Sequence, residues 1–299
     1  MKKTISMKKI ISCSCIFLIA LLITGCSGST QTSGVTTNYK IGNGDLNVKL
    51  IDNAPPSEIF PGAEFKIIAE LSNQLAYDAK NLDVVITGLE PGYFQVYPLE
   101  QKIALIQGKS ITNPAGDKEM LEFSGNAGSL VKSAQYYTNK YLLQTNYDST
   151  MEFQDTVCIN TDLYGVNDAG CKVQDKLSYP GQGAVLAVSK MEQVVISGSS
   201  AGMQFRIYLT NRGQGKLKLV TLDKSELGGE ALDCQFQGEV DKPLEYDFKD
   251  KQTALLLCDA AISEQISYQT ILALDFSYHY ELNKEYQLKI VNPNAALVS

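Results

Sequence analysis

The stretch FRIYLTN at residues 205–211 decides the fold class, because apolar side chains occupy every second position up to a final asparagine. Successive side chains of a β-strand point to opposite faces of the sheet, so Phe205, Ile207 and Leu209 share one buried face. Asn211 suits the turn that ends such a strand. The stretch therefore predicts a strand of a half-buried antiparallel sheet.

The same pattern occurs earlier in the chain, where Ile67, Ala69 and Leu71 precede Asn73 at alternate positions. Similar alternations continue after residue 40, separated at short intervals by Gly, Asn, Asp and Pro, and long amphipathic helical patterns are scarce. This arrangement is typical of antiparallel all-β domains. We therefore predict an all-β fold made of two tandem immunoglobulin-like β-sandwich domains.

Proline and glycine in SYPGQG at residues 178–183 indicate an interior linker. Within the first domain we expect one or two helical turns over residues 129–137, and a closing hairpin that turns at Asp148-Ser149. The predicted organisation is a signal peptide (1–25), a lipidated cysteine with its tether (26–40), the first β-sandwich (41–177), the linker (178–183), the second β-sandwich (184–293) and a tail (294–299).

The N-terminal residues have the features of a secretory signal. Lysines at the start are followed by an uncharged apolar run of 14 residues, Ile10–Ile23. A membrane-spanning helix needs roughly 20 residues, so a transmembrane anchor is less favoured. The sequence Ile23-Thr24-Gly25-Cys26 resembles the lipobox of prokaryotic lipoproteins. This resemblance implies that the sulfur of Cys26 is lipidated and that Cys26 becomes the mature N-terminus, followed by a flexible polar tether.

The net charge of the chain limits the classes of partner that it is expected to bind. Removal of residues 1–25 takes away four lysines, which leaves 22 basic and 33 acidic residues and a formal charge of −11. The chain lacks a basic cluster, so nucleic acid is not an expected partner. We expect contact with the membrane through the N-terminal lipid, and with a protein or glycan partner at the cell surface.

Four cysteines remain when Cys26 and the two signal-peptide cysteines are set aside: Cys158, Cys171, Cys234 and Cys258. An even number outside the cytoplasm favours disulfide bonds. Four cysteines allow three pairings, and spacing distinguishes them only weakly. We expect the two local pairs, Cys158 with Cys171 and Cys234 with Cys258. A zinc site is disfavoured because no C-x₂-C spacing occurs.

Two resemblances bear on the architecture. The segment Asn211-Arg212-Gly213-Gln214-Gly215 resembles the strand and Asn-x-Gly turn of CARDB and related immunoglobulin-like adhesion modules. The sequence from Tyr147 to Cys158, with Cys171 and residues 181–184, is similar to uncharacterised archaeal secreted proteins that have tandem immunoglobulin-like domains. Both resemblances imply the architecture and no chemistry.

The sequence contains few residues suited to catalysis. His279, the single histidine, alternates with Tyr278 and Tyr280 and is expected to lie on a strand surface or in packing, which leaves Ser-His-Asp chemistry without a base. We therefore expect no enzymatic activity and no cofactor. The first disulfide loop contains four oxygen-bearing side chains for which capping of turns is the favoured role, because EF-hand spacing is missing, and Ca²⁺ binding is the alternative: Asn160, Asp162, Asn167 and Asp168.

The expected function is that of a lipid-anchored cell-envelope protein, facing outside the cytoplasm, with a structural, adhesive or protein-binding role. A solute-binding lipoprotein of a transporter is one alternative, and it would need two lobes of alternating strands and helices. An envelope glycan hydrolase is another, and it would need a cleft with a perturbed carboxylic acid. The tyrosines are expected mainly to fill strand faces, although exposed ones could contact proteins or sugars.

Overall fold

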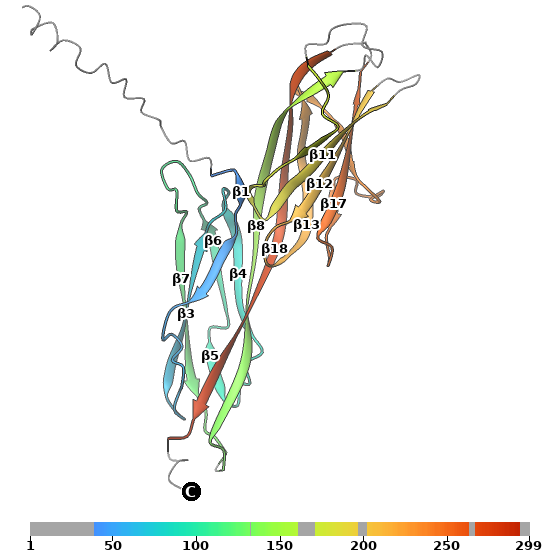
Figure 1. Cartoon of the computed structure of the whole chain (residues 1–299). Helices are drawn as coiled ribbons and strands as arrows, with labels where there is room; N and C mark the ends of the chain where they lie inside the picture. The colour runs from blue at the N-terminus through green and yellow to red at the C-terminus, as the bar shows by residue number, and fades with distance from the viewer. Residues whose placement is uncertain (1–38, 132, 161–170, 197–201, 263–266, 294–299) are drawn as a thin grey trace, which may run out of the picture. The chain divides into compact units, whose positions relative to one another are not determined.

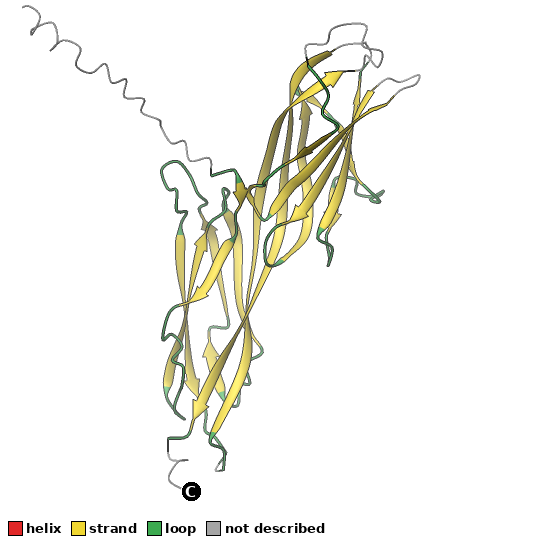
Figure 2. Cartoon of the chain, in the orientation of Figure 1, coloured by secondary structure: helices red, strands yellow, loops and turns green. Residues whose placement is uncertain are grey.

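The computed structural model describes residues 39–131, 133–160, 171–196, 202–262 and 267–293, which fold into β-strands joined by loops (Figure 2). The predicted all-β fold, with sheets packed as sandwiches, is therefore confirmed. The helical turns expected over residues 129–137 are wrong, because the described part of this segment is a loop that leads into a strand. None of the described ranges contains a helix with the length and apolar character needed to cross a bilayer.

Two smaller sheets and one large sheet contain most of the strands (Figure 1). The four-stranded sheet consists of β2 (Leu46–Leu50), β3 (Glu64–Asn73), β7 (Lys118–Ala127) and β5 (Phe94–Tyr97), in that order. The five-stranded sheet consists of β15 (Asp233–Phe236), β17 (Thr253–Ala261), β12 (Gly202–Asn211), β11 (Leu186–Ile196) and β9 (Lys176–Ser178). The seven-stranded sheet has the order β14 (Glu230–Ala231), β13 (Lys216–Leu227), β18 (Ser267–Val291), β8 (Tyr136–Asn160), β4 (Ala79–Thr87) and β6 (Glu100–Ile106), and β16 (Glu245–Asp247) also pairs with β13.

The chain passes through these sheets twice in the same way. Strands β2, β3, β5 and β7 build the four-stranded sheet, while β4, β6 and β8 enter the large sheet. Strands β11, β12, β15 and β17 then build the five-stranded sheet, while β13, β16 and β18 enter the large sheet. Corresponding strands also have corresponding neighbours in the two smaller sheets, since β3 lies between β2 and β7 as β12 lies between β11 and β17. The fold is therefore an internal repeat of seven corresponding strands.

The two asparagines of the sequence pattern close equivalent turns. In each, Oδ1 accepts a hydrogen bond from the backbone N–H two residues later, and Nδ2 donates to the carbonyl four residues later. The partners are Leu75 (2.9 Å) and Tyr77 (3.0 Å) for Asn73, and Gly213 (3.0 Å) and Gly215 (2.9 Å) for Asn211. The apolar residues before each asparagine are fully buried. The sequence repeat is thus also a repeat of hydrogen-bond geometry.

Strands β8 and β18 are each 25 residues long and pair antiparallel along their whole length. At roughly 3.3 Å per residue, each extends about 80 Å. The hairpin expected around Asp148-Ser149 is wrong, because both residues lie in the middle of β8. Buried positions keep one phase from Tyr141 to Phe153, with Ser149 among them. The pair also lacks the positive-φ residues, usually glycine or asparagine, that a two-residue hairpin turn requires.

The long strands join the repeats by reciprocal exchange. The first half of β8 pairs with β4 of its own repeat, and the first half of β18 pairs with β13 of its own. The second half of β18 returns to the first repeat. There, Ile59 donates its N–H to the carbonyl of Lys289 and accepts from the N–H of Val291, both at 2.9 Å. The second half of β8 extends into the second repeat beside β18, where Phe153 packs edge-on against Tyr179.

This exchange differs from the expected division into domains over residues 41–177 and 184–293. Each predicted domain contains one long strand entirely, whereas in the structure each strand contributes to both sandwiches. The physical reason is that period-two alternation identifies the buried face of a strand but not its partner.

The segment predicted as a linker is packed between the repeats. Its last two residues belong to β10 (Gln182–Ala184), which is buried and pairs in parallel with β1 (Gly42–Asn43). The carbonyl of Gly183 accepts a hydrogen bond of 2.7 Å from the N–H of Ala76. Gly183 has a φ of +74°, and a Cβ there would lie 2.6 Å from the Cβ of Ala76. Glycine is therefore required at this close approach of the two repeats.

Candidate functional site

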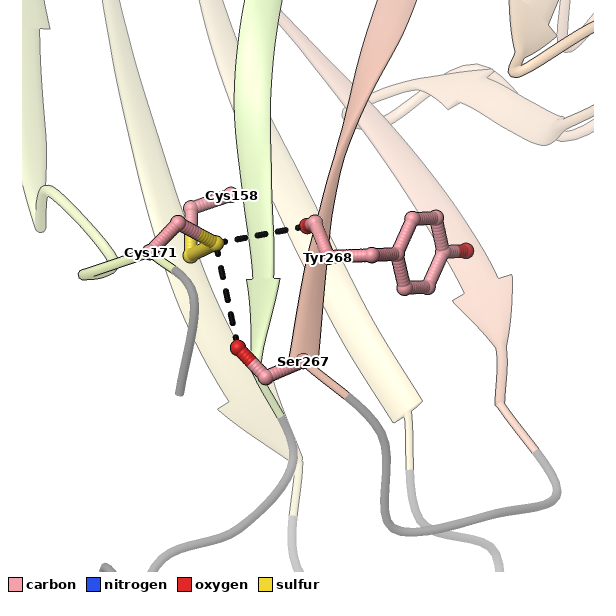
Figure 3. The surroundings of a disulfide bond; sticks show 4 residues. All are labelled: Cys158, Cys171, Ser267 and Tyr268. Carbon is pink, nitrogen blue, oxygen red and sulfur yellow. Dashed lines mark hydrogen bonds between the residues drawn. A yellow bond between two sulfur atoms is a disulfide. The ribbon is translucent and has the colours of Figure 1, made fainter. Parts of the chain in front are cut away.

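The first disulfide bond joins Cys158, near the end of β8, to Cys171. Figure 3 shows the Sγ atom of Cys171 beside the start of β18. This atom is 3.3 Å from the carbonyl oxygen of Tyr268 and 3.8 Å from the hydroxyl oxygen of Ser267. This disulfide therefore lies at the end of the long ladder between β8 and β18.

The second disulfide joins Cys234 of β15 to Cys258 of β17, which lie directly opposite each other and are buried. Both disulfides have the local partners that the sequence favours. Two such bonds indicate an oxidising environment outside the cytoplasm, because thiols in the cytoplasm are kept reduced.

The other predicted site residues are mostly outside the described residues. Cys26 lies there, as do Asp162, Asn167 and Asp168 of the suggested calcium site, while Asn160 is the last residue of β8. Among the described residues, no group of three or more His, Cys, Asp or Glu side chains is arranged to hold a metal ion. Lipidation and calcium binding therefore stay predictions.

His279 lies on the outer face of the large sheet, opposite Asp148 in the ladder. Its Nδ1 is 2.8 Å from Oδ1 of Asp148, and Asn81 donates a hydrogen bond of 3.0 Å to the other carboxylate oxygen. Burial acts to raise the pKa of Asp148, but these hydrogen bonds outweigh it and hold the pKa below its ordinary value. The hydroxyl of Ser277, two residues away, donates to Asp223, so it is not aligned with the histidine as a nucleophile would be.

A cleft of about 460 Å³ lies where residues 40–41, residues 152–155 of β8 and residues 179–182 converge. Lys40 pairs with Glu152 at 2.6 Å, and the hydroxyl of Tyr179 donates to Asp155. Burial acts to lower the pKa of Lys40, but the bond to Glu152 raises it above its ordinary value. Burial, followed by the bond to Asp155, raises the pKa of Tyr179. These four groups therefore form two pairs within the protein, and the cleft is best explained as a place where segments of the fold pack together.

The tyrosines mainly fill the core, as expected. Tyr141, Tyr147, Tyr278 and Tyr280 are buried, whereas Tyr136 is 62% exposed. A further exposed tyrosine, which the sequence pattern did not indicate, lies on the outer face of β5 and β7: Tyr97 is 82% exposed. The alternation of residues 94–97 could have indicated the exposed face, but only the sheet register places β7 beside it.

Comparisons with known proteins leave the family open. No protein-family model matches the chain, and no curated protein matches its sequence. Among solved structures, a crystal structure of Spo0M, a sporulation control protein from Bacillus subtilis, aligns with 56% of this chain and 80% of its own at 10% identity and a TM-score of 0.19. The major capsid protein P2 of bacteriophage PM2 aligns with 79% of this chain and 98% of its own at 7% identity and a TM-score of 0.13. Scores this low carry no argument about function.

Proposed function

We propose that this protein is a lipid-anchored component of the cell envelope with a structural or adhesive role. The observation that carries the proposal is the reciprocal exchange of β8 and β18, reinforced by two disulfides. Neither sandwich is complete without a strand of the other repeat. A scaffold of this kind suits a protein that presents binding surfaces in an oxidising environment.

The proposed anchor is the lipid on Cys26, and the polar residues that follow it form the tether. The tether ends at Lys40, whose side chain pairs with Glu152 of β8. The chain then continues into β1, which pairs with β10 between the repeats. The tether would therefore join the fold at the junction of the two repeats.

A solute-binding lipoprotein is less favoured, since such proteins have two lobes of strands and helices and the described ranges contain strands alone. The favoured partners are a protein or a glycan at the cell surface.

The anchor is tested by metabolic labelling with a radioactive fatty acid and by detergent phase partitioning in a prokaryotic host. We expect the wild-type protein to be labelled and to enter the detergent phase, and Cys26→Ala to do neither. The matched control is Cys13→Ala, which changes a cysteine of the signal peptide and should behave as wild type. An unlabelled wild-type protein in the aqueous phase would refute the anchor.

The adhesive role is tested separately. Detergent-solubilised protein should bind saturably to envelopes prepared from cells that lack it. Binding that never saturates, or none above that of an unrelated lipoprotein, would contradict the role.

A further inference from the structure

A groove of about 400 Å³ lies along β5, at the edge of the four-stranded sheet. None of the nine described residues that line it carries a charge, although 20% of the chain is charged. Its volume falls within the range of small-molecule sites. A groove with this lining suits an uncharged ligand, because a charged one would lose hydration without gaining an oppositely charged partner among the lining side chains.

The outer face beside the groove has four exposed side chains in two facing pairs. Gln95 of β5 lies opposite Asn126 of β7, and Tyr97 lies opposite Ser124. Facing side chains on a sheet lie about 5 Å apart, and the next pair on the same face lies about 7 Å further along the strand. One aromatic ring, two amides and a hydroxyl therefore share a small flat area, which we call the β5–β7 surface.

The fold does not require this surface. Tyr97 is 82% exposed, so it contributes little to the core. The second repeat builds the corresponding strand pair, β15 with β17, with different outer residues. There, Asp233 faces Asp259, and Gln235 faces Leu257. Because the second repeat forms without an aromatic residue at this place, the aromatic surface of the first repeat is available for binding.

We propose that the β5–β7 surface binds neutral sugar residues of a cell-surface glycan. The inference rests on the proposed function, which places the protein where such glycans occur. The ring of Tyr97 stacks on the apolar C–H face of a sugar. The amides of Gln95 and Asn126 and the hydroxyl of Ser124 both donate to and accept from sugar hydroxyls.

A peptide strand added to the sheet edge is the competing occupant. Strand β5 has four residues, and Pro98, which has no N–H, follows it directly. Short edge strands and proline limit strand addition, because few backbone groups are available for pairing. The groups displayed here are uncharged side chains, which favours the sugar.

The test is a screen of detergent-solubilised full-length protein on an array of neutral and charged glycans, followed by titration with the neutral oligosaccharide bound best. We expect Tyr97→Ala to weaken that binding about fivefold to tenfold, and Tyr97→Phe to retain it, because the ring provides the stacking. Tyr136→Ala is the matched control, since Tyr136 is also an exposed strand tyrosine but lies outside the groove. Thermal unfolding of each variant checks that the fold is unchanged.

Binding to charged glycans alone, binding to no glycan on the array, or neutral-glycan binding unaffected by Tyr97→Ala would each overturn the inference. Recovery of an extended peptide as the ligand of this surface would also overturn it. The outcome is separable from that of the proposed function. A protein that is labelled with lipid but binds no glycan refutes the inference alone, and an unlabelled protein that binds neutral glycans refutes the lipid anchor alone.

Discussion

Replacement of Asn73 by alanine should destabilise the protein more than the same replacement of Asn211. The side chain of Asn73 is fully buried and makes three hydrogen bonds, including one of 2.8 Å to the carbonyl of Ile106. That of Asn211 is 8% exposed and makes two. A buried polar group left without its partner costs about 1–3 kcal/mol. Allowing for partial relaxation, we expect losses of about 3–6 kcal/mol for Asn73→Ala and about 2–4 kcal/mol for Asn211→Ala.

The assay is equilibrium unfolding in urea, followed by far-UV circular dichroism and by tyrosine fluorescence, since the chain has no tryptophan. The free energy of unfolding is obtained by linear extrapolation to zero denaturant. Asn47→Ala is the matched control, because Asn47 is exposed on β2 and should change stability by less than about 0.5 kcal/mol. The reasoning fails if Asn73→Ala is no more destabilising than Asn47→Ala, or if Asn211→Ala costs more than Asn73→Ala.

Three further predictions follow from the same packing. Because β8 and β18 contribute to both sandwiches, calorimetry should show one unfolding transition. Both Ile67→Ala and Ile207→Ala should lower the temperature of that transition. Two separate transitions, each moved by only one variant, would contradict this prediction. Replacement of both Cys234 and Cys258 by alanine should lower the free energy of unfolding by about 3 kcal/mol and the Tm by about 6–12 °C. An unchanged Tm would contradict this prediction. Burial raises the pKa of four core tyrosines, so the stability they provide is complete below about pH 10 and is lost above it, by about 1.4 kcal/mol per pH unit for each group. These four residues are Tyr141, Tyr147, Tyr278 and Tyr280. The absorbance of their tyrosinate forms should appear only together with unfolding, and its appearance in the folded protein would refute the prediction.

The sequence predicted what depends on near neighbours along the chain. Alternation around Ile67 and Ile207 gave the buried faces of β3 and β12, because side-chain direction in a strand follows from position alone. The asparagines that end these strands indicated turns for the same local reason. Chain spacing also favoured the disulfide pairing that the structure shows, including Cys234 with Cys258, although spacing alone left other pairings open.

What depends on pairing between distant strands could not be predicted. Asp148 is followed by serine, and both residues favour turns, yet here β18 supplies a continuous partner and the strand does not turn. The contact between Asp148 and His279 joins positions 131 residues apart, so no local pattern indicates it. The β5–β7 surface was missed for the same reason, since Tyr97 and Ser124 become neighbours only through the sheet register.

The residue pair at the midpoint of the long ladder illustrates how the outer positions of the strands differ from the buried ones in what the fold requires of them. Asp148 and His279 form the thirteenth of 25 residue pairs, at the point where each long strand passes from its own repeat to the other. Both side chains are about half exposed, and a polar contact between exposed side chains contributes little to stability, so the exchange is held by the backbone ladder and the apolar inner face. The outer positions are therefore free to differ between the repeats, while the buried alternation and the turn asparagines are the same in both. The outer positions of β5 and β7 are among those that differ, with Tyr97 facing Ser124 where the second repeat has two facing aspartates. That difference serves neither the core nor the exchange, and the proposed binding of a neutral glycan would account for it.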